Sequence, residues 1–142
     1  MKKIIFVCEG NTCRSPMAEK IFANFVKKEN IRLKVESFGI DADNGIEMNI
    51  LAKRALKNLG ILVGTKKSKK LCKIESNAIY ITMTKQIKSF LPYKNVFAFS
   101  DLVGGEDIID PYGNNQEIYD KTAIIIFNAC EKLLKRIKSI IN

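Results

Sequence analysis

The sequence predicts an α/β fold: an open, mostly four-stranded parallel sheet with helices on both faces and a phosphate-binding loop after the first strand. Two observations predict this class. Short runs rich in β-branched residues alternate along the chain with longer amphipathic segments of helical periodicity. The first apolar run ends in Cys8–Pro16 (CEGNTCRSP), and open α/β sheets bind ligands at such carboxyl ends of strands.

The first elements follow from local patterns. Lys3–Cys8 is short, apolar and β-branched, which is typical of a strand buried on both faces. We expect Ser15 to cap the following helix, with Pro16 at its first position and Glu19 in its first turn. The apolar stripe of this helix consists of Met17, Ala18, Ile21, Phe22, Phe25 and Val26. Ile31–Phe38 is typical of a second strand.

Helical and strand patterns continue to alternate along the rest of the chain. The predicted segments are helix Met48–Leu59, basic surface loop with a short helix Thr65–Lys73, strand Ala78–Met83, short helix Thr84–Leu91, strand Asn95–Phe99, loop Ser100–Asn115 and a final helix from about Gln116 to Ile140. A length of 142 residues without internal repeats or linkers fits a single domain over 1–142, large enough for a substantial core.

Composition narrows the function. The chain has 24 basic and 15 acidic residues, and its net charge of +9 favours anionic partners. Histidine is absent, which removes every mechanism with an imidazole base and argues against a transition-metal site. Four cysteines with no recognisable signal peptide fit the reducing cytoplasm, where each cysteine needs its own explanation.

The segment Cys8–Pro16 has the features of a phosphate-binding loop. Backbone N–H groups ahead of a helix, together with the helix dipole, attract anions. Gly10 and Asn11 are residue types that tolerate left-handed backbone angles, which such a loop needs. Arg14 can hold two oxygens of a tetrahedral oxyanion. The ATP-binding pattern GxxxxGK[ST] does not fit this segment, so the loop is of a different kind.

Cys8 is the candidate nucleophile of this loop. A thiol next to a cation and a helix N-terminus is readily ionised. Its sulfur can attack the phosphorus of a bound phosphate in line, while Arg14 and the amides hold the other oxygens. The alternative is a buried core cysteine, the commonest place for this residue type. The order of Gly, Asn, Arg and Ser-Pro after Cys8 favours the catalytic interpretation.

The reaction also needs an acid that protonates the leaving group. Without histidine, the candidates are Asp, Glu, Lys, Tyr and Cys. Asp110 in the segment IIDPYG is the best of them, because it lies in a predicted loop before a proline and an aromatic residue that could form a pocket wall. The alternative is an Asp-Pro pair that only begins a turn.

Taken together, these residues resemble the low-molecular-weight protein tyrosine phosphatases. The family opens with a strand, the motif C-x-G-N-x-C-R-S-P and a helix, to which Cys8–Pro16 is similar. Its late Asp-Pro-aromatic motif is similar to Asp110, Pro111 and Tyr112, and the resemblance covers nearly all of the chain. It implies hydrolysis of phosphotyrosine in phosphorylated proteins, with a cysteinyl-phosphate on Cys8, release of inorganic phosphate, and no cofactor or metal.

The resemblance also implies a role for individual residues. Arg14 binds the transition state, and Asp110 acts first as acid and then as base. Ser15 steadies the Cys8 thiolate. The residues implied to shape the loop or to contact the substrate are Glu9, Gly10, Asn11, Thr12, Cys13 and Tyr112.

The resemblance further bears on the cysteines. It implies that Cys13 can form a reversible disulfide with Cys8 under peroxide. Cys72 and Cys130 match nothing in the family, and we expect both to be structural.

The chain departs from the family pattern in several places. A histidine that braces the loop asparagine is missing, and Thr65 is expected to replace part of its bonding. Ile40–Met48 lacks the aromatic residue that often lines the pocket, and Glu9 replaces an apolar residue. Thr12 is similar to the branch of the family that hydrolyses phosphoarginine, so a phosphoarginine phosphatase is the nearest alternative.

Two other functions are less well supported. Arsenate reduction on this fold resembles a relay through two further cysteines close together, whereas Cys72 and Cys130 are far apart in the sequence. A nucleic-acid or membrane-surface module is suggested by Lys66–Lys70 and by the basic final helix. A solvated loop and a terminal helix docked on the core explain both segments. We therefore expect a monomer with no nucleic-acid or membrane partner.

Overall fold

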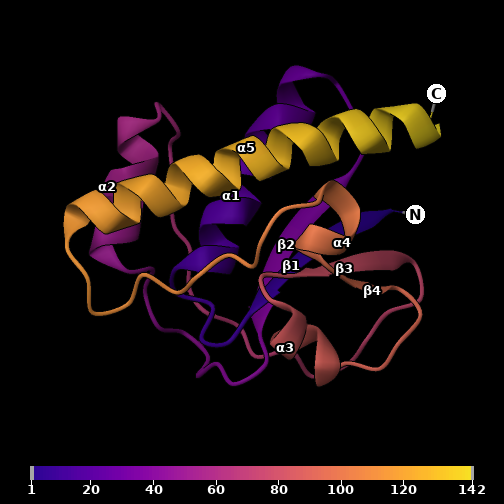
Figure 1. Cartoon of the computed structure of the whole chain (residues 1–142), viewed down its shortest axis with the longest axis horizontal. Helices are drawn as coiled ribbons and strands as arrows, with labels where there is room; N and C mark the ends of the chain where they lie inside the picture. Colours follow the sequence, from indigo (N-terminus) through magenta and orange to yellow (C-terminus); the bar gives the residue numbers. More distant parts are fainter. Residues whose placement is uncertain (1, 142) are drawn as a thin grey trace.

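The computed structural model describes residues 2–141, so Met1 and Asn142, the ends of the predicted domain, lie outside the described residues. Within this range four strands form one parallel sheet in the order β2-β1-β3-β4 (Figure 1). The strands are β1 Lys3–Cys8, β2 Lys34–Gly39, β3 Ala78–Thr82 and β4 Val96–Ala98. The predicted α/β class with a parallel sheet is confirmed.

Helices lie on both sides of this sheet. They are α1 Arg14–Lys28, α2 Ile50–Asn58, α3 Lys85–Ser89, α4 Phe99–Val103 and α5 Gln116–Ile141. On one face, Phe6 of β1 packs against Phe22 of α1 and Phe99 of α4, with ring centroids 5.8 and 5.6 Å apart. The long helix α5 packs against α1, α2 and α4 on this side, while α3 lies on the other (Figure 1). The predicted docking of the terminal helix is confirmed.

The position of β1 determines where a ligand can bind. Its residues from Ile4 to Cys8 are all buried, and it pairs with β2 on one side and β3 on the other. The chain leaves β1 toward β2 and later returns on the opposite side to form β3, so the strand order reverses at β1. Ligands of open α/β sheets bind at such a switch point, and here it holds the loop after Cys8.

The start of α1 differs from the prediction. The helix begins at Arg14, one residue before the expected cap Ser15, and the residue ahead of it, Cys13, caps no amide with its side chain. Pro16 is therefore the third helical residue, and Glu19 lies beyond the first turn. The prediction was wrong because the Ser15 hydroxyl binds the Cys8 thiol instead, as described below.

Two loops also differ from their predictions. The segment Thr65–Lys73 contains no helix, and its β-bridges are Glu47–Lys67 and Gly39–Lys70. Lys66 in this segment is buried, so the solvated loop predicted there is wrong at that position. The loop predicted from Ser100 begins instead with the short helix α4.

Candidate active site

The loop Glu9–Cys13 is held tightly against the end of β2. The amides of Ile40 and Asp41 donate to the carbonyls of Cys8 and Glu9, at 3.0 and 2.9 Å. A Cβ atom added to Gly39 would lie 2.8 Å from the Ala42 Cβ and 3.0 Å from the Asn11 backbone nitrogen. Glycine is therefore required at the end of β2. This role of Gly39 was not predicted, since a glycine that follows a predicted strand is ordinary in sequence.

Asn11 is the turning point of the loop. Its φ of 56° is left-handed, as predicted, whereas Gly10 does not adopt a positive φ and the prediction for that residue was wrong. The Asn11 backbone amide lies 3.3 Å from the Cys8 Sγ and donates to it. The left-handed turn thus directs a backbone dipole at the thiol.

The Asn11 side chain uses all its hydrogen-bonding positions. Its Oδ1 accepts from Lys66 Nζ at 3.1 Å and from the Lys69 amide at 2.9 Å. Its Nδ2 donates to the hydroxyls of Ser15 and Ser37, both at 2.9 Å. Four bonds from three parts of the chain hold one amide, so the loop is braced from behind.

Thr65 is not the brace that was predicted. It is exposed, and Lys66 next to it makes the bond to Asn11 instead. The residues missed behind the loop also include Ser37, which donates to the Glu19 carboxylate at 2.7 Å. No sequence motif marks either of them, because a lysine run and a serine in a strand are common on protein surfaces.

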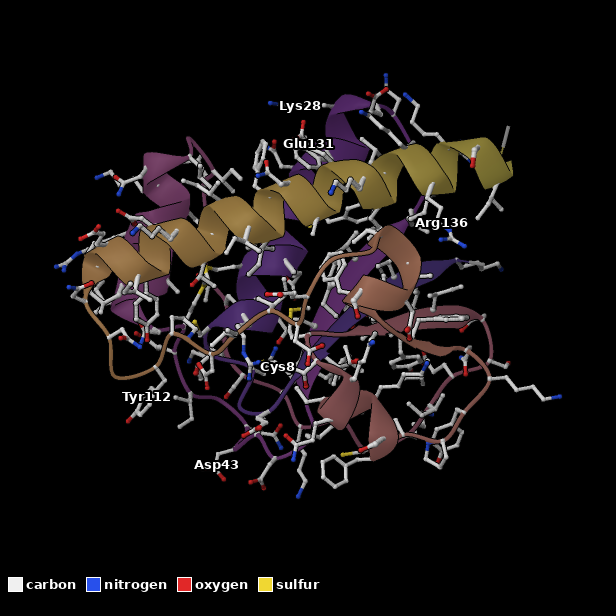
Figure 2. All side chains as sticks on the ribbon, in the orientation of Figure 1. Cys8, Lys28, Asp43, Tyr112, Glu131 and Arg136 are labelled. Carbon is white, nitrogen blue, oxygen red and sulfur yellow. The ribbon has the colours of Figure 1, made fainter. Side chains whose placement is uncertain are left out.

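Cys8 is buried at the carboxyl end of β1, under the loop (Figure 2). Its Sγ lies 2.8 Å from the Ser15 Oγ. The Ser15 oxygen accepts from Asn11 Nδ2, and its hydroxyl proton can be donated to the sulfur or to the Phe38 carbonyl, 3.4 Å away. The sulfur thus faces two hydrogen-bond donors, the Ser15 hydroxyl and the Asn11 amide.

The N-terminus of α1 is left open. It has neither a side-chain cap nor an acidic residue in its first turn, whereas Asn49 caps α2 and Thr84 caps α3. Among the hydrogen bonds of residues 2–141, none is donated by the amides of Gly10, Thr12 or Cys13. These donors, with the helix dipole, are available to the oxygens of an anion.

Arg14 and Asp110 meet across the loop although they are far apart in the sequence. Arg14 is 5% exposed, and its Nη1 donates to the Ile108 carbonyl at 2.9 Å. Its Nη2 lies 3.7 Å from the Asp110 Oδ2, and the Asp110 side chain is 49% exposed. The Asp110 Oδ1 also accepts from the Tyr112 amide at 3.1 Å. A buried cation and a half-exposed carboxylate therefore flank the same opening.

The predicted site residues share one cavity of about 230 Å³. Its walls consist of Cys8, Glu9, Gly10, Asn11, Thr12, Cys13, Arg14, Asp41, Asn49, Asp110 and Tyr112. Ser15 lies behind Cys8 rather than on the wall. Tyr112 is 80% exposed on the loop before α5 and points away from the sheet (Figure 2). Asp41 and Asn49 were missed, although a polar tract after β2 and a helix cap are recognisable signals.

The remaining cysteines are divided between surface and interior. Burial, helped by the charges of Asp110 and Cys8, raises the pKa of Cys13 well above its ordinary value, so Cys13 stays a thiol at neutral pH. Cys130 is fully buried in the core, as expected for a structural residue. Cys72 is exposed, so the structural role predicted for it is wrong.

Neither a metal centre nor a membrane span is found in residues 2–141. This range has no group of three or more His, Cys, Asp or Glu side chains that could hold a metal ion. No helix in it is long and apolar enough to cross a bilayer.

The chain is similar to known proteins over nearly all of its length. Residues 3–140 match the family described as "Low molecular weight phosphotyrosine protein phosphatase". The protein-arginine-phosphatase of Bacillus subtilis (strain 168) is 33% identical over 144 residues, covering 95% of this chain and 96% of that protein. The low molecular weight protein-tyrosine-phosphatase PtpB of Staphylococcus epidermidis is 30% identical, covering 92% and 96%. A YwlE mutant from Bacillus subtilis has a similar crystal structure, with a TM-score of 0.91 and 30% identity over 97% of this chain and 99% of that one. The chain therefore belongs to the low molecular weight phosphotyrosine protein phosphatase family.

Proposed function

We propose that this chain is a protein phosphatase that hydrolyses phosphotyrosine through a cysteinyl-phosphate on Cys8. One observation carries the proposal. The Cys8 sulfur lies between the Ser15 hydroxyl and the Asn11 amide, at the uncapped start of α1, with the buried Arg14 guanidinium on the same cavity wall. A nucleophile and an anion site thus share one position. Membership of the family supports the same chemistry.

In the first step, the Cys8 thiolate attacks phosphorus. The S–P bond forms while the bond from phosphorus to the tyrosine oxygen breaks. The Arg14 guanidinium and the free amides of the loop hold the three other oxygens as charge shifts onto them. Asp110 gives its proton to the leaving oxygen, and its place at the cavity mouth, 3.7 Å from Arg14, suits that transfer.

In the second step, water replaces sulfur. The Asp110 carboxylate takes a proton from the water as its oxygen bonds to phosphorus, and the electron pair of the S–P bond returns to sulfur. Ser15 donates to the thiolate that is formed again. Inorganic phosphate leaves, and Asp110 is protonated for the next cycle.

Steady-state kinetics on small aryl phosphates test this mechanism. We expect Cys8→Ser to lose nearly all activity. Asp110→Asn should lose at least about 100-fold with a poor leaving group such as phenol, and less with p-nitrophenol, which needs little protonation. Mass spectrometry of acid-quenched turnover should find a phosphoryl group on Cys8. Normal turnover by Cys8→Ser, or the absence of that adduct, would contradict the proposal.

A phosphoarginine substrate is the second candidate, and two wall residues favour it. Thr12 and Asp41 line the cavity, and a carboxylate with a hydroxyl suits a guanidinium better than a phenyl ring. The Bacillus subtilis relative is named a protein-arginine-phosphatase. Rates on matched phosphotyrosine and phosphoarginine peptides separate the two candidates, with Thr12→Ile as the diagnostic variant. Preference for phosphoarginine that Thr12→Ile reverses would replace phosphotyrosine as the substrate.

The remaining parts of the proposal concern setting and partners. We propose a cytoplasmic monomer that binds phosphorylated proteins and neither nucleic acid nor membranes. Light scattering after size-exclusion chromatography should give a mass close to 16.1 kDa. Binding to duplex DNA or anionic vesicles at physiological salt would count against it.

A further inference from the structure

We propose that Lys66 is a positioning residue that sets the direction of the hydrogen bonds ending at the Cys8 thiolate. The inference rests on the proposed function, in which Cys8 is the nucleophile. Lys66 lies between α2 and β3, is 7% exposed, and touches the back of the loop rather than the substrate cavity. Its Nζ donates to the Asn11 Oδ1 at 3.1 Å.

The direction of these bonds follows from what each group can donate. An ammonium group and a backbone N–H can only donate, so Lys66 Nζ and the Lys69 amide require the oxygen of the Asn11 side chain to face them. The Asn11 Nδ2 must then face the other way and donate to Ser15. The Ser15 hydroxyl proton can then be donated to the sulfur, 2.8 Å away, or to the Phe38 carbonyl, 3.4 Å away, and the shorter contact favours the sulfur.

The ammonium of Lys66 is matched by polar groups although it is buried. Its Nζ also donates to the Lys67 carbonyl at 3.0 Å and lies 3.7 Å from the Glu19 carboxylate. Ser37 joins Glu19 to Asn11, which closes a ring of contacts behind the loop. Buried charges are retained where they are paired in this way.

The surroundings of Lys66 shift its pKa in opposite directions. Burial lowers the pKa of Lys66, the Glu19 carboxylate raises it, and the positive charges of Lys69 and Lys20 lower it further. Removing Lys66 would leave the Asn11 oxygen with the Lys69 amide and the Glu19 carboxylate with Ser37 and Lys20, so the Asn11 side chain would be held in its orientation less firmly.

Lys66→Met tests the inference, with Lys67→Met as its matched control. Both variants remove one positive charge from the same segment, but Lys67 is exposed. We expect Lys66→Met to lower kcat on an aryl phosphate at least tenfold, with KM changed less than about threefold. Tenfold is about 1.4 kcal/mol, close to the lower limit for a hydrogen bond to a charged group. Lys67→Met should stay within about twofold of wild type, and Lys66→Arg should recover part of the loss.

Alkylation of Cys8 by iodoacetamide gives a readout that does not need catalysis. We expect its rate at neutral pH, followed at the Cys8 peptide by mass spectrometry, to fall in Lys66→Met by a factor similar to kcat. Circular dichroism selects temperatures at which every variant is folded. If folded Lys66→Met matches Lys67→Met in both kcat and alkylation rate, Lys66 is only structural and the inference is wrong. If wild type does not hydrolyse the aryl phosphate, the proposed function fails, while the alkylation rates still decide the role of Lys66.

Discussion

The close contact between the phosphate-binding loop and β2 predicts a large effect of Gly39→Ala. The added Cβ would overlap the Glu9 carbonyl oxygen and would lie 2.8 Å from the Ala42 Cβ and 3.0 Å from the Asn11 nitrogen. Two of these three neighbours are backbone atoms, which cannot rotate away as a flexible side chain can. The strain must therefore move either the loop or the end of β2.

The size of the effect can be estimated from overpacking of protein interiors, which costs roughly 1–3 kcal/mol. Because the neighbours are backbone atoms, we expect about 3 kcal/mol for Gly39→Ala. For a domain near this size each kcal/mol lowers Tm by about 2–4 °C, so Tm should fall by roughly 6–12 °C. We also expect kcat to fall, since Asn11 turns the loop that carries the amides.

The fall in Tm of Gly39→Ala is measured by thermal unfolding followed by circular dichroism, with Gly10→Ala as the control. A Cβ on Gly10 would meet only the Thr12 Oγ1, at 3.9 Å, and Gly10 has no positive φ. Its free energy of unfolding should therefore change by no more than about 0.5 kcal/mol. Equal melting temperatures for the two variants would refute the tight packing at Gly39.

Three further predictions concern stability measured by urea unfolding. Asn49→Ala removes the acceptor of two helix amides, at 2.8 and 3.2 Å, and should cost about 1 kcal/mol. Burial raises the pKa of Glu36, but the hydrogen bond and charge of Lys69, together with the charges of Lys34 and Lys3, outweigh it and hold that pKa below its ordinary 4.5. Glu36 therefore stabilises the fold above its unfolded pKa, and this stability is lost as pH falls through the folded pKa. In Glu36→Gln the free energy of unfolding should therefore fall less than in wild type between about pH 5 and pH 3. An equal fall in the two proteins would contradict this prediction. Cys130→Ser places a hydroxyl in the core and should cost about 1–3 kcal/mol without changing kcat; a neutral result would show that the hydroxyl finds a partner.

The order of strands and helices could be predicted because it depends on local patterns. β1 was recognised with its observed bounds, since an apolar run from Ile4 to Cys8 follows Lys3. The start of α1 was not, because a Ser-Pro pair is typical of a helix N-terminus and suggested that Ser15 was the cap. In the structure the Ser15 hydroxyl forms a hydrogen bond with the Cys8 thiol instead, and α1 has no side-chain cap. A local pattern cannot show this contact, because the thiol comes from the preceding strand.

The candidate site could be predicted only where its residues share a motif. The loop lies in one continuous segment, and Asp110 was assigned from its place in a predicted loop before Pro111 and Tyr112 and from the resemblance of these residues to a family motif. Gly39 and Lys66 come from other parts of the chain, and each is needed because of a contact made only after folding. A glycine at a strand end and a lysine in a basic run are ordinary in sequence, so their roles depend on the register of β2 and the path of the chain after α2.

The net charge of +9 was interpreted as attraction for anionic partners, but two of the cations act inside the molecule. Arg14 and Lys66 are both buried and lie on opposite sides of the same loop, one on the cavity wall and one behind Asn11. The Arg14 charge faces the substrate, so its interaction with the phosphoryl oxygens strengthens as the transition state forms. The Lys66 charge lies behind the loop and orients the loop's dipoles before the substrate binds. Loss of Arg14 should therefore weaken binding of a transition-state analogue such as vanadate far more than loss of Lys66. Alkylation of Cys8 should respond to both, since each directs donors or positive charge at the sulfur.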